Sequence, residues 1–137
     1  MLKLLITSAG LLGATAALAQ EAGNLTQSPP PAPFQQVSEI VELPEFLPGL
    51  GTLFVDPATL PAGPFLGYDR DGRLSATIYM PTMEELEAGT AYDDLALGAP
   101  EVVATDIYFN AGHPGVEQPH AHVVLYHDAE AKGRLAE

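Results

Sequence analysis

The complete absence of cysteine is the feature that most limits how this 137-residue chain can fold. Without cysteine there is no disulfide framework, no thiolate metal site and no cysteine nucleophile. The length allows a single domain, since domains usually contain about 100–150 residues. A small domain without disulfides is stabilised by a metal ion, by a partner chain or by compact packing alone.

Residues 1–19 have the pattern of a secretory signal peptide. Lys3 supplies the positive charge, an apolar run follows, and Ala17-Leu18-Ala19 fits the small-x-small cleavage site before Gln20. A transmembrane helix is the alternative, but the run is shorter than the span of about 20 residues and rich in Ala and Gly. We therefore expect an exported protein, in the periplasm or the medium, with no stable membrane anchor after cleavage.

The chain carries 5 Lys and Arg against 18 Asp and Glu, a formal charge of −13. Such a charge repels phosphate backbones and anionic lipid surfaces. We therefore expect no nucleic-acid partner. Because the domain is small and its last strands have apolar residues on both faces, we expect it to form a homo-oligomer.

After the leader, the sequence divides into three parts. Residues 20–48 form a proline-rich linker and docking arm, in which Ser28–Pro33 favours an extended polyproline conformation outside the fold. Residues 49–130 form a β-rich domain, and residues 131–137 are a C-terminal tail. No internal repeat is present.

The domain is predicted to be mainly β, as a small antiparallel sheet or partial barrel. Strands are expected at 51–55, 64–68, 73–80, 101–109 and 120–127, with 64–80 forming a hairpin through a turn at 69–72. One short helix is expected near 82–88, because Thr82 and Glu85 form a capping box and Gly89 ends the segment.

All four histidines lie near the end of the chain, at His113, His120, His122 and His127. His120 and His122 are two residues apart, so on a strand both side chains project from one face. A turn at Pro114-Gly115 would bring His113 back over that strand. His127 has the opposite parity and joins the others only if the strand bends.

A histidine cluster of this kind suits a divalent metal ion, and imidazole ligands favour Zn²⁺, Cu²⁺ or Fe²⁺ over Ca²⁺ or Mg²⁺. Matching like faces of the last two strands pairs Tyr108 with His120 and Asp106 with His122. Asp106 would then orient the His122 ring or act as a further ligand. The alternative is a polar sheet face whose histidines hydrogen-bond to their neighbours without an ion.

Three functions remain open on this basis. The first is an exported metal-binding module that uses His113, His120 and His122, with Asp106 and His127 as possible additional ligands. The second is a small cupin-like metalloenzyme, and the third is a structural or interaction protein that binds no metal. No Gly-x-Ser-x-Gly motif or glycine-rich phosphate loop indicates another chemistry.

The runs Phe109–Gly115 and Pro119–His122 resemble an uncharacterised family of exported bacterial proteins with a Gly-His-Pro-Gly element followed by Pro-His-x-His or Pro-His-x-Asp-x-His. His122 stands at the Asp of the second pattern, and Val124 stands at its last His. This resemblance implies a fold relation over about residues 50–127 but no activity. A weaker resemblance links the His-x-His to the first cupin motif, with His127 in the place of the glutamate and no second motif.

Overall fold

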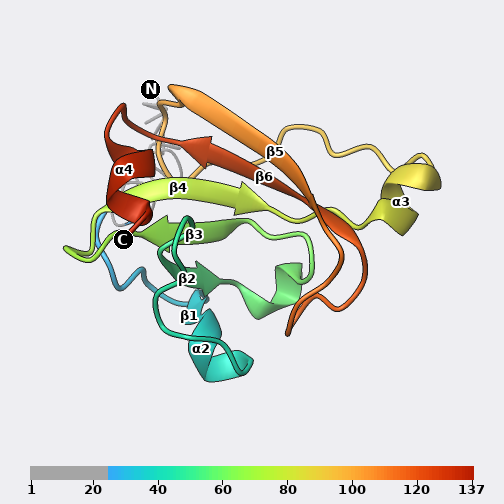
Figure 1. Cartoon of the computed structure of the whole chain (residues 1–137), viewed down its shortest axis with the longest axis horizontal. Coiled ribbons are helices and arrows are strands. Elements are labelled where there is room, and N and C mark those ends of the chain that lie inside the picture. Colours follow the sequence, from blue (N-terminus) through green and yellow to red (C-terminus); the bar gives the residue numbers. More distant parts are fainter. Residues whose placement is uncertain (1–24) are drawn as a thin grey trace, which may run out of the picture.

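The computed structural model describes residues 25–137, which form a six-stranded antiparallel sheet in the order β1-β2-β3-β4-β6-β5 (Figure 1). The strands are β1 (Gln35–Gln36), β2 (Thr52–Val55), β3 (Phe65–Tyr68), β4 (Leu74–Tyr79), β5 (Ala104–Asn110) and β6 (His120–Tyr126). The predicted mainly β, antiparallel fold is thus confirmed as an open sheet. The predicted signal peptide lies outside the described residues.

The hairpin predicted over 64–80 is present as β3 and β4, with Phe65 opposite Ile78. Its turn is held by Asp69, whose Oδ1 accepts hydrogen bonds from the backbone N–H groups of Asp71 and Arg73, both at 2.9 Å. Strand β4 pairs on its other side with β6, so β6 lies between β4 and β5. The histidine-bearing strand is therefore an inner strand of the sheet.

The predicted short helix is α3 (Met83–Glu87), which projects beyond one end of the sheet in Figure 1. It begins where the sequence predicts, because the Thr82 hydroxyl accepts a hydrogen bond from the Glu85 N–H at 3.2 Å. The fold also contains α2 (Val37–Ile40), α4 (Ala131–Leu135) and the 3₁₀ turn η1 (Pro57–Thr59). The described residues thus contain more short helices than the single one predicted.

The proline-rich segment was expected to lie outside the fold, and this is wrong for the part that the structure describes. Leu25 and Phe34 pack against the buried side chains on one face of the sheet. The Leu25 carbonyl also accepts a hydrogen bond from the Tyr68 hydroxyl at 2.7 Å. Leu25 and Phe34, which lie on either side of Ser28–Pro33, bind this stretch to the sheet. Its prolines have no N–H group that needs a partner.

Residues 131–137, expected as a tail, contain the packed helix α4. Ala131 and Leu135 are both fully buried, at the i, i+4 spacing that places them on one face of a helix. Arg134 forms ion pairs with Asp69 at 2.7 Å and Asp128 at 2.6 Å. Apolar burial and these ion pairs together hold the C-terminal helix on the sheet.

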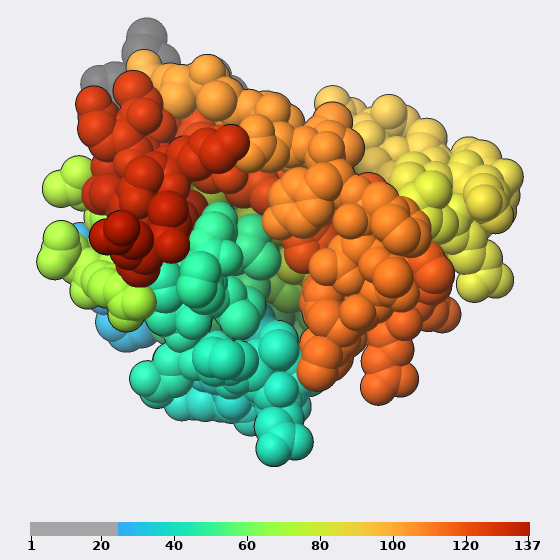
Figure 2. Space-filling model, in the orientation of Figure 1, coloured from blue at the N-terminus to red at the C-terminus, as the bar shows by residue number. Residues whose placement is uncertain are grey.

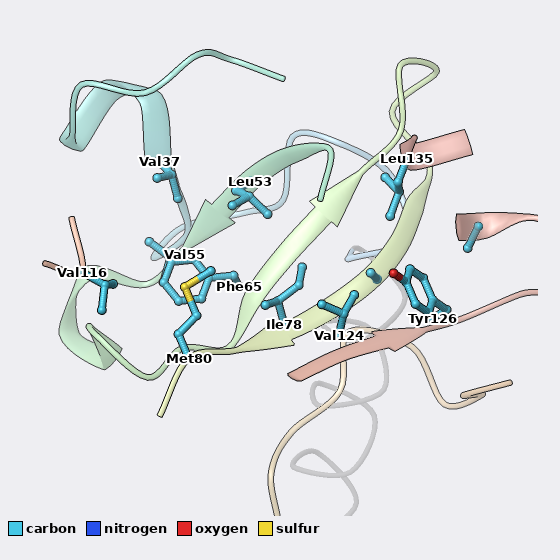
Figure 3. Packing of buried hydrophobic residues seen from close by; sticks show 12 residues of the cluster. Val37, Leu53, Val55, Phe65, Ile78, Met80, Val116, Val124, Tyr126 and Leu135 are labelled. Carbon is cyan, nitrogen blue, oxygen red and sulfur yellow. The ribbon is translucent and has the colours of Figure 1, made fainter. Parts of the chain in front are cut away.

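The inner sheet strands are covered on both faces. One face packs against α4 and the segment 37–50, which we call the arm, and Figure 3 shows Val37 of the arm on the side of the sheet that carries Leu53 and Val55. The opposite face packs against the N-terminal segment through the cluster Phe54, Leu66, Tyr68 and Leu74.

At β5 and β6, burial is the reverse of what side-chain polarity indicates. The histidine face of β6 turns inward, and His120 and His122 are buried with Val124 and Tyr126. The apolar face of β5 turns outward, with Ile107 71% and Phe109 63% exposed. The arm covers the sheet on the histidine side, whereas the outer face of β5 is left exposed in the described part of the chain. Among residues 25–137, no helix is long and apolar enough to cross a membrane.

Candidate metal centre

The pairing of β5 with β6 sets the position of the two strand histidines. The structure pairs Tyr108 with His122 and Asn110 with His120. The predicted pairing of Tyr108 with His120 is therefore wrong by two residues. The prediction of faces is nevertheless confirmed, because a shift of two residues leaves every side chain on its own side of the sheet.

The loop between these strands returns His113 to the same site. Residues His113–Val116 form a tight turn, in which the N–H of each end residue donates to the carbonyl of the other at 3.0 and 3.1 Å. Gly115 has a φ of +91°, the conformation that the third position of a type II turn requires. Pro114-Gly115 thus makes the predicted turn and brings the His113 ring over β6.

The Nε2 atoms of the three histidines converge on one point. The distances are 2.9 Å between His120 and His122, 3.0 Å between His120 and His113, and 3.3 Å between His113 and His122. Two nitrogens bound to zinc at about 2.0–2.1 Å with tetrahedral angles lie about 3.3–3.4 Å apart. An ion between the three rings therefore requires each to move by only a few tenths of an ångström.

Backbone carbonyls fix which ring nitrogens carry hydrogen. The Nδ1 of His113 lies 3.0 Å from the Pro114 carbonyl oxygen, and the Nδ1 of His120 lies 2.7 Å from that of Gln118. A carbonyl oxygen only accepts, so both Nδ1 atoms donate, and the Nε2 of each neutral ring is left with a lone pair. These two lone pairs face each other at 3.0 Å, an arrangement that a cation or a shared proton stabilises.

Burial keeps the strand histidines neutral. It lowers the pKa of His122 to about 4, and the neighbouring rings of His120 and His113 act in the same direction. Burial also lowers the pKa of His120, against the opposing effect of its hydrogen bond to Gln118. Both rings therefore hold free lone pairs at neutral pH and can bind a metal ion without first losing a proton.

Tyr108, not Asp106, lies beside His122. Its hydroxyl is 3.1 Å from the His122 Nδ1, and burial together with the charge of Asp106 raises the pKa of this phenol. As a neutral hydroxyl, it can accept the Nδ1 hydrogen and leave the His122 Nε2 free for an ion. Sequence reasoning put Tyr108 on this face but gave the orienting role to Asp106 because of the register error.

Asp106 and His127, the possible additional ligands, both lie outside the cluster. Asp106 is opposite Val124 and binds the Lys132 ammonium at 2.7 Å and the Tyr126 hydroxyl at 3.1 Å. His127 is 2.7 Å from the Thr77 hydroxyl and 2.6 Å from the Glu101 carbonyl. In the described part of the chain, the group that can share one ion consists of His113, His120 and His122.

No family model matches this sequence, and no curated protein matches it. A solved structure does: the crystal structure of hypothetical protein TTHB210 from Thermus thermophilus, with a TM-score of 0.60 and 39% sequence identity. The match covers 69% of this chain and 94% of the TTHB210 chain. The chain belongs to the TTHB210 family.

Membership of the TTHB210 family gives a relation of sequence and fold without an activity, since TTHB210 is itself a hypothetical protein. The resemblance to an uncharacterised exported family stays a prediction. The weaker cupin resemblance does not extend to the fold, because cupins are double-sheet jelly rolls of eight strands whereas residues 25–137 form one open six-stranded sheet.

Proposed function

We propose that this protein is a small exported module that binds one divalent metal ion through His113, His120 and His122. The observation that carries the proposal is the convergence of three Nε2 atoms within 3.3 Å of one another, two of them with lone pairs fixed by backbone carbonyls. Histidines that merely pack in a core pair a donor with an acceptor. Here His113 and His120 direct acceptors at each other.

The ion we propose is Zn²⁺, Cu²⁺ or Fe²⁺. Neutral imidazole is a good ligand for all three, and oxygen-preferring ions such as Ca²⁺ and Mg²⁺ would need carboxylates. Three protein ligands leave a coordination position open, as in catalytic zinc sites. A small metalloenzyme is therefore the second candidate function, and the open position is the feature that favours it.

Elemental analysis of the purified protein tests the proposal. We expect a stoichiometric divalent metal, and we expect a strong chelator to lower the melting temperature. Free ion at about 100 times its Kd stabilises a folded protein by about 2.7 kcal/mol, which corresponds to about 10 °C in a domain of this size.

His113→Ala and His127→Ala form a matched pair for this experiment. His113 is half-buried in a loop, so its replacement should remove the metal and leave the fold intact. His127→Ala removes a buried imidazole outside the cluster and should keep the metal, although it destabilises the fold through Thr77 and Glu101. A protein that contains no metal after reconstitution, or two variants with equal metal content, would contradict the proposal.

Export rests on the leader pattern of residues 1–19. Expression in a bacterium, with fractionation and mass spectrometry, should give a processed protein in the periplasm or medium that begins at Gln20. Ala17→Arg should block cleavage, since the site requires small residues. A cytoplasmic product that retains residues 1–19 would show that the leader is not a signal peptide.

A further inference from the structure

An apolar cavity of about 300 Å³ lies beside the histidine cluster, between the arm and the sheet. Its walls include Val41 and Leu47 from the arm, Leu53 from β2 and Phe65 from β3. In Figure 2 a furrow separates the arm, in teal, from the loop at 110–119, in orange. Small-molecule sites are typically concave and mostly apolar with a few polar groups, so an open apolar hollow of this size is a candidate binding site.

The polar side chains of the cavity wall are gathered at one end. They belong to Tyr108, Asn110, His113 and His122, which come from β5, the loop and β6. The remaining side chains of the wall are apolar, and none of the wall residues is charged. The cavity thus has an apolar body and one end formed by two of the three histidines.

An ion at the histidine cluster would be the sole charge facing this cavity among the described residues. Three neutral imidazoles leave its double positive charge uncompensated, and low-dielectric surroundings make an uncompensated charge costly. An anionic donor in the open coordination position would offset that charge. The apolar body of the cavity would accept a hydrocarbon group attached to that donor.

We propose that this cavity binds a monocarboxylate with a hydrocarbon tail, whose carboxylate occupies the coordination position that the three histidines leave open. The proposal rests on the proposed metal site. The tail lies between the arm and the sheet, and it enters past Ile40 and Leu60, wall residues that are each 38% exposed. The volume is at the lower end of the range for small-molecule sites, about 300–1,000 Å³, so the ligand is small.

The acidic surface opposes anion binding only at long range. The formal charge of −13 slows the approach of an anion, but at physiological ionic strength fields are screened over about 8 Å. No acidic side chain lines the cavity itself. Affinity at the site is therefore governed by the ion and by burial of the tail.

The test is calorimetric titration of zinc-loaded protein with octanoate, acetate and 1-octanol. Each buried methylene group contributes about four-fold in affinity, so octanoate should bind at least about 100-fold tighter than acetate. It should also bind at least about ten-fold tighter than 1-octanol, which has the tail without the charge, and about ten-fold tighter than octanoate binds the zinc-free protein. With Co²⁺ in place of zinc, octanoate should change the visible absorption spectrum, because its carboxylate enters the coordination sphere.

Two tryptophan substitutions at the entrance locate the site. Ile40→Trp and Leu60→Trp should each weaken octanoate binding at least about ten-fold and leave zinc affinity unchanged. Leu86→Trp is the control, because Leu86 is 40% exposed, close to the exposure of Ile40, but lies on α3 away from this cavity. Octanoate binding that is unchanged in both entrance variants would overturn the assignment to this cavity.

The two proposals fail in different ways. Protein that takes up none of zinc, copper and iron contradicts the metal site, and the carboxylate proposal is then also wrong. Protein that takes up zinc but binds octanoate no better than acetate retains its metal site and contradicts the carboxylate proposal alone. Equal octanoate affinity with and without zinc would show that the tail binds in the cavity without contact between the carboxylate and the ion, and would likewise contradict the carboxylate proposal.

Discussion

The Nε2 atoms of His120 and His122 lie 2.9 Å apart, with their rings inclined by only 29°. Residues two apart on a strand are separated by about 6.6–6.8 Å along the backbone, so both rings must lean toward each other. The His120 ring is held in this orientation by the Gln118 carbonyl, and the His122 ring is held by the Tyr108 hydroxyl.

Tyr108→Phe should weaken metal binding by about 10–100-fold, because removing the hydrogen bond that orients a metal-binding histidine has an effect of that size. Competition with a chromophoric chelator measures the change. Tyr126→Phe is the matched control, since this hydroxyl lies on the same sheet face but binds Asp106. Equal losses in the two variants would show that Tyr108 does not orient His122.

Metal-free protein should become less stable as the pH falls from about 6.5 to about 4. A histidine in an unfolded chain has a pKa of about 6.5, whereas burial lowers that of His122 to about 4. The unfolded chain therefore binds more protons between these values, and the free energy of unfolding decreases as the pH is lowered. Urea unfolding at several pH values measures this dependence.

The replacement His122→Gln should reduce the same pH dependence. Hydrogen bonds from Lys132 and Arg134 lower the pKa values of Asp106 and Asp128, and the stability that these carboxylates contribute begins to be lost at about pH 5. Both carboxylates are retained in His122→Gln, so the difference between the two proteins isolates the histidine contribution. A metal-free protein whose stability is constant from pH 6.5 to 4 would contradict the assignment of a neutral, buried His122.

Leu135→Ala should lower the free energy of unfolding by about 2–5 kcal/mol, the usual cost of truncating a fully buried leucine. Chemical denaturation followed by circular dichroism measures the loss. Leu86→Ala on α3 is the control, because Leu86 is partly exposed and its truncation should have a much smaller effect. Similar values for the two variants would mean that α4 does not contribute to the core.

We propose that the outer face of β5 and β6 binds a second copy of the chain. β5 is at the edge of the sheet; it presents Ile107 and Phe109 to solvent, and Val103, directly before it, is also exposed. An edge strand with exposed apolar side chains favours pairing with another chain. Light scattering at micromolar concentration should therefore report an oligomer.

Phe109→Lys should convert this oligomer to a monomer, because it places a charge within the apolar face. Leu60→Lys, on the other side of the molecule at the cavity entrance, should leave the oligomer intact. A monomeric wild-type protein at ordinary ionic strength, or an oligomer that Phe109→Lys leaves unchanged, would contradict the proposed interface.

Local patterns in the sequence predicted those features that depend on neighbouring residues. Alternation placed the strands and put His120, His122 and Tyr108 on one face, because the side-chain period of a strand is two. Thr82 predicted the start of α3 through its capping hydrogen bond. Pro114-Gly115 predicted the turn that carries His113 to the strand histidines.

Contacts between distant residues decided the rest. Register shifts of two residues preserve every face, so alternation cannot distinguish the pairing of Tyr108 with His122 from the pairing with His120. Only the closed hairpin, with its tight turn at His113–Val116, fixes which of them forms. This difference of two residues replaces Asp106 with Tyr108 as the neighbour of His122.

Which face of the last strands is buried was likewise beyond the sequence pattern. Polarity favours burial of Ile107 and Phe109, but the arm at 37–50 lies on the opposite side and covers the histidines instead. The sequence by itself determined which side chains share a face. The tertiary structure decided which face became the interior, because burial depends on segments far apart in the chain that meet only in the folded protein.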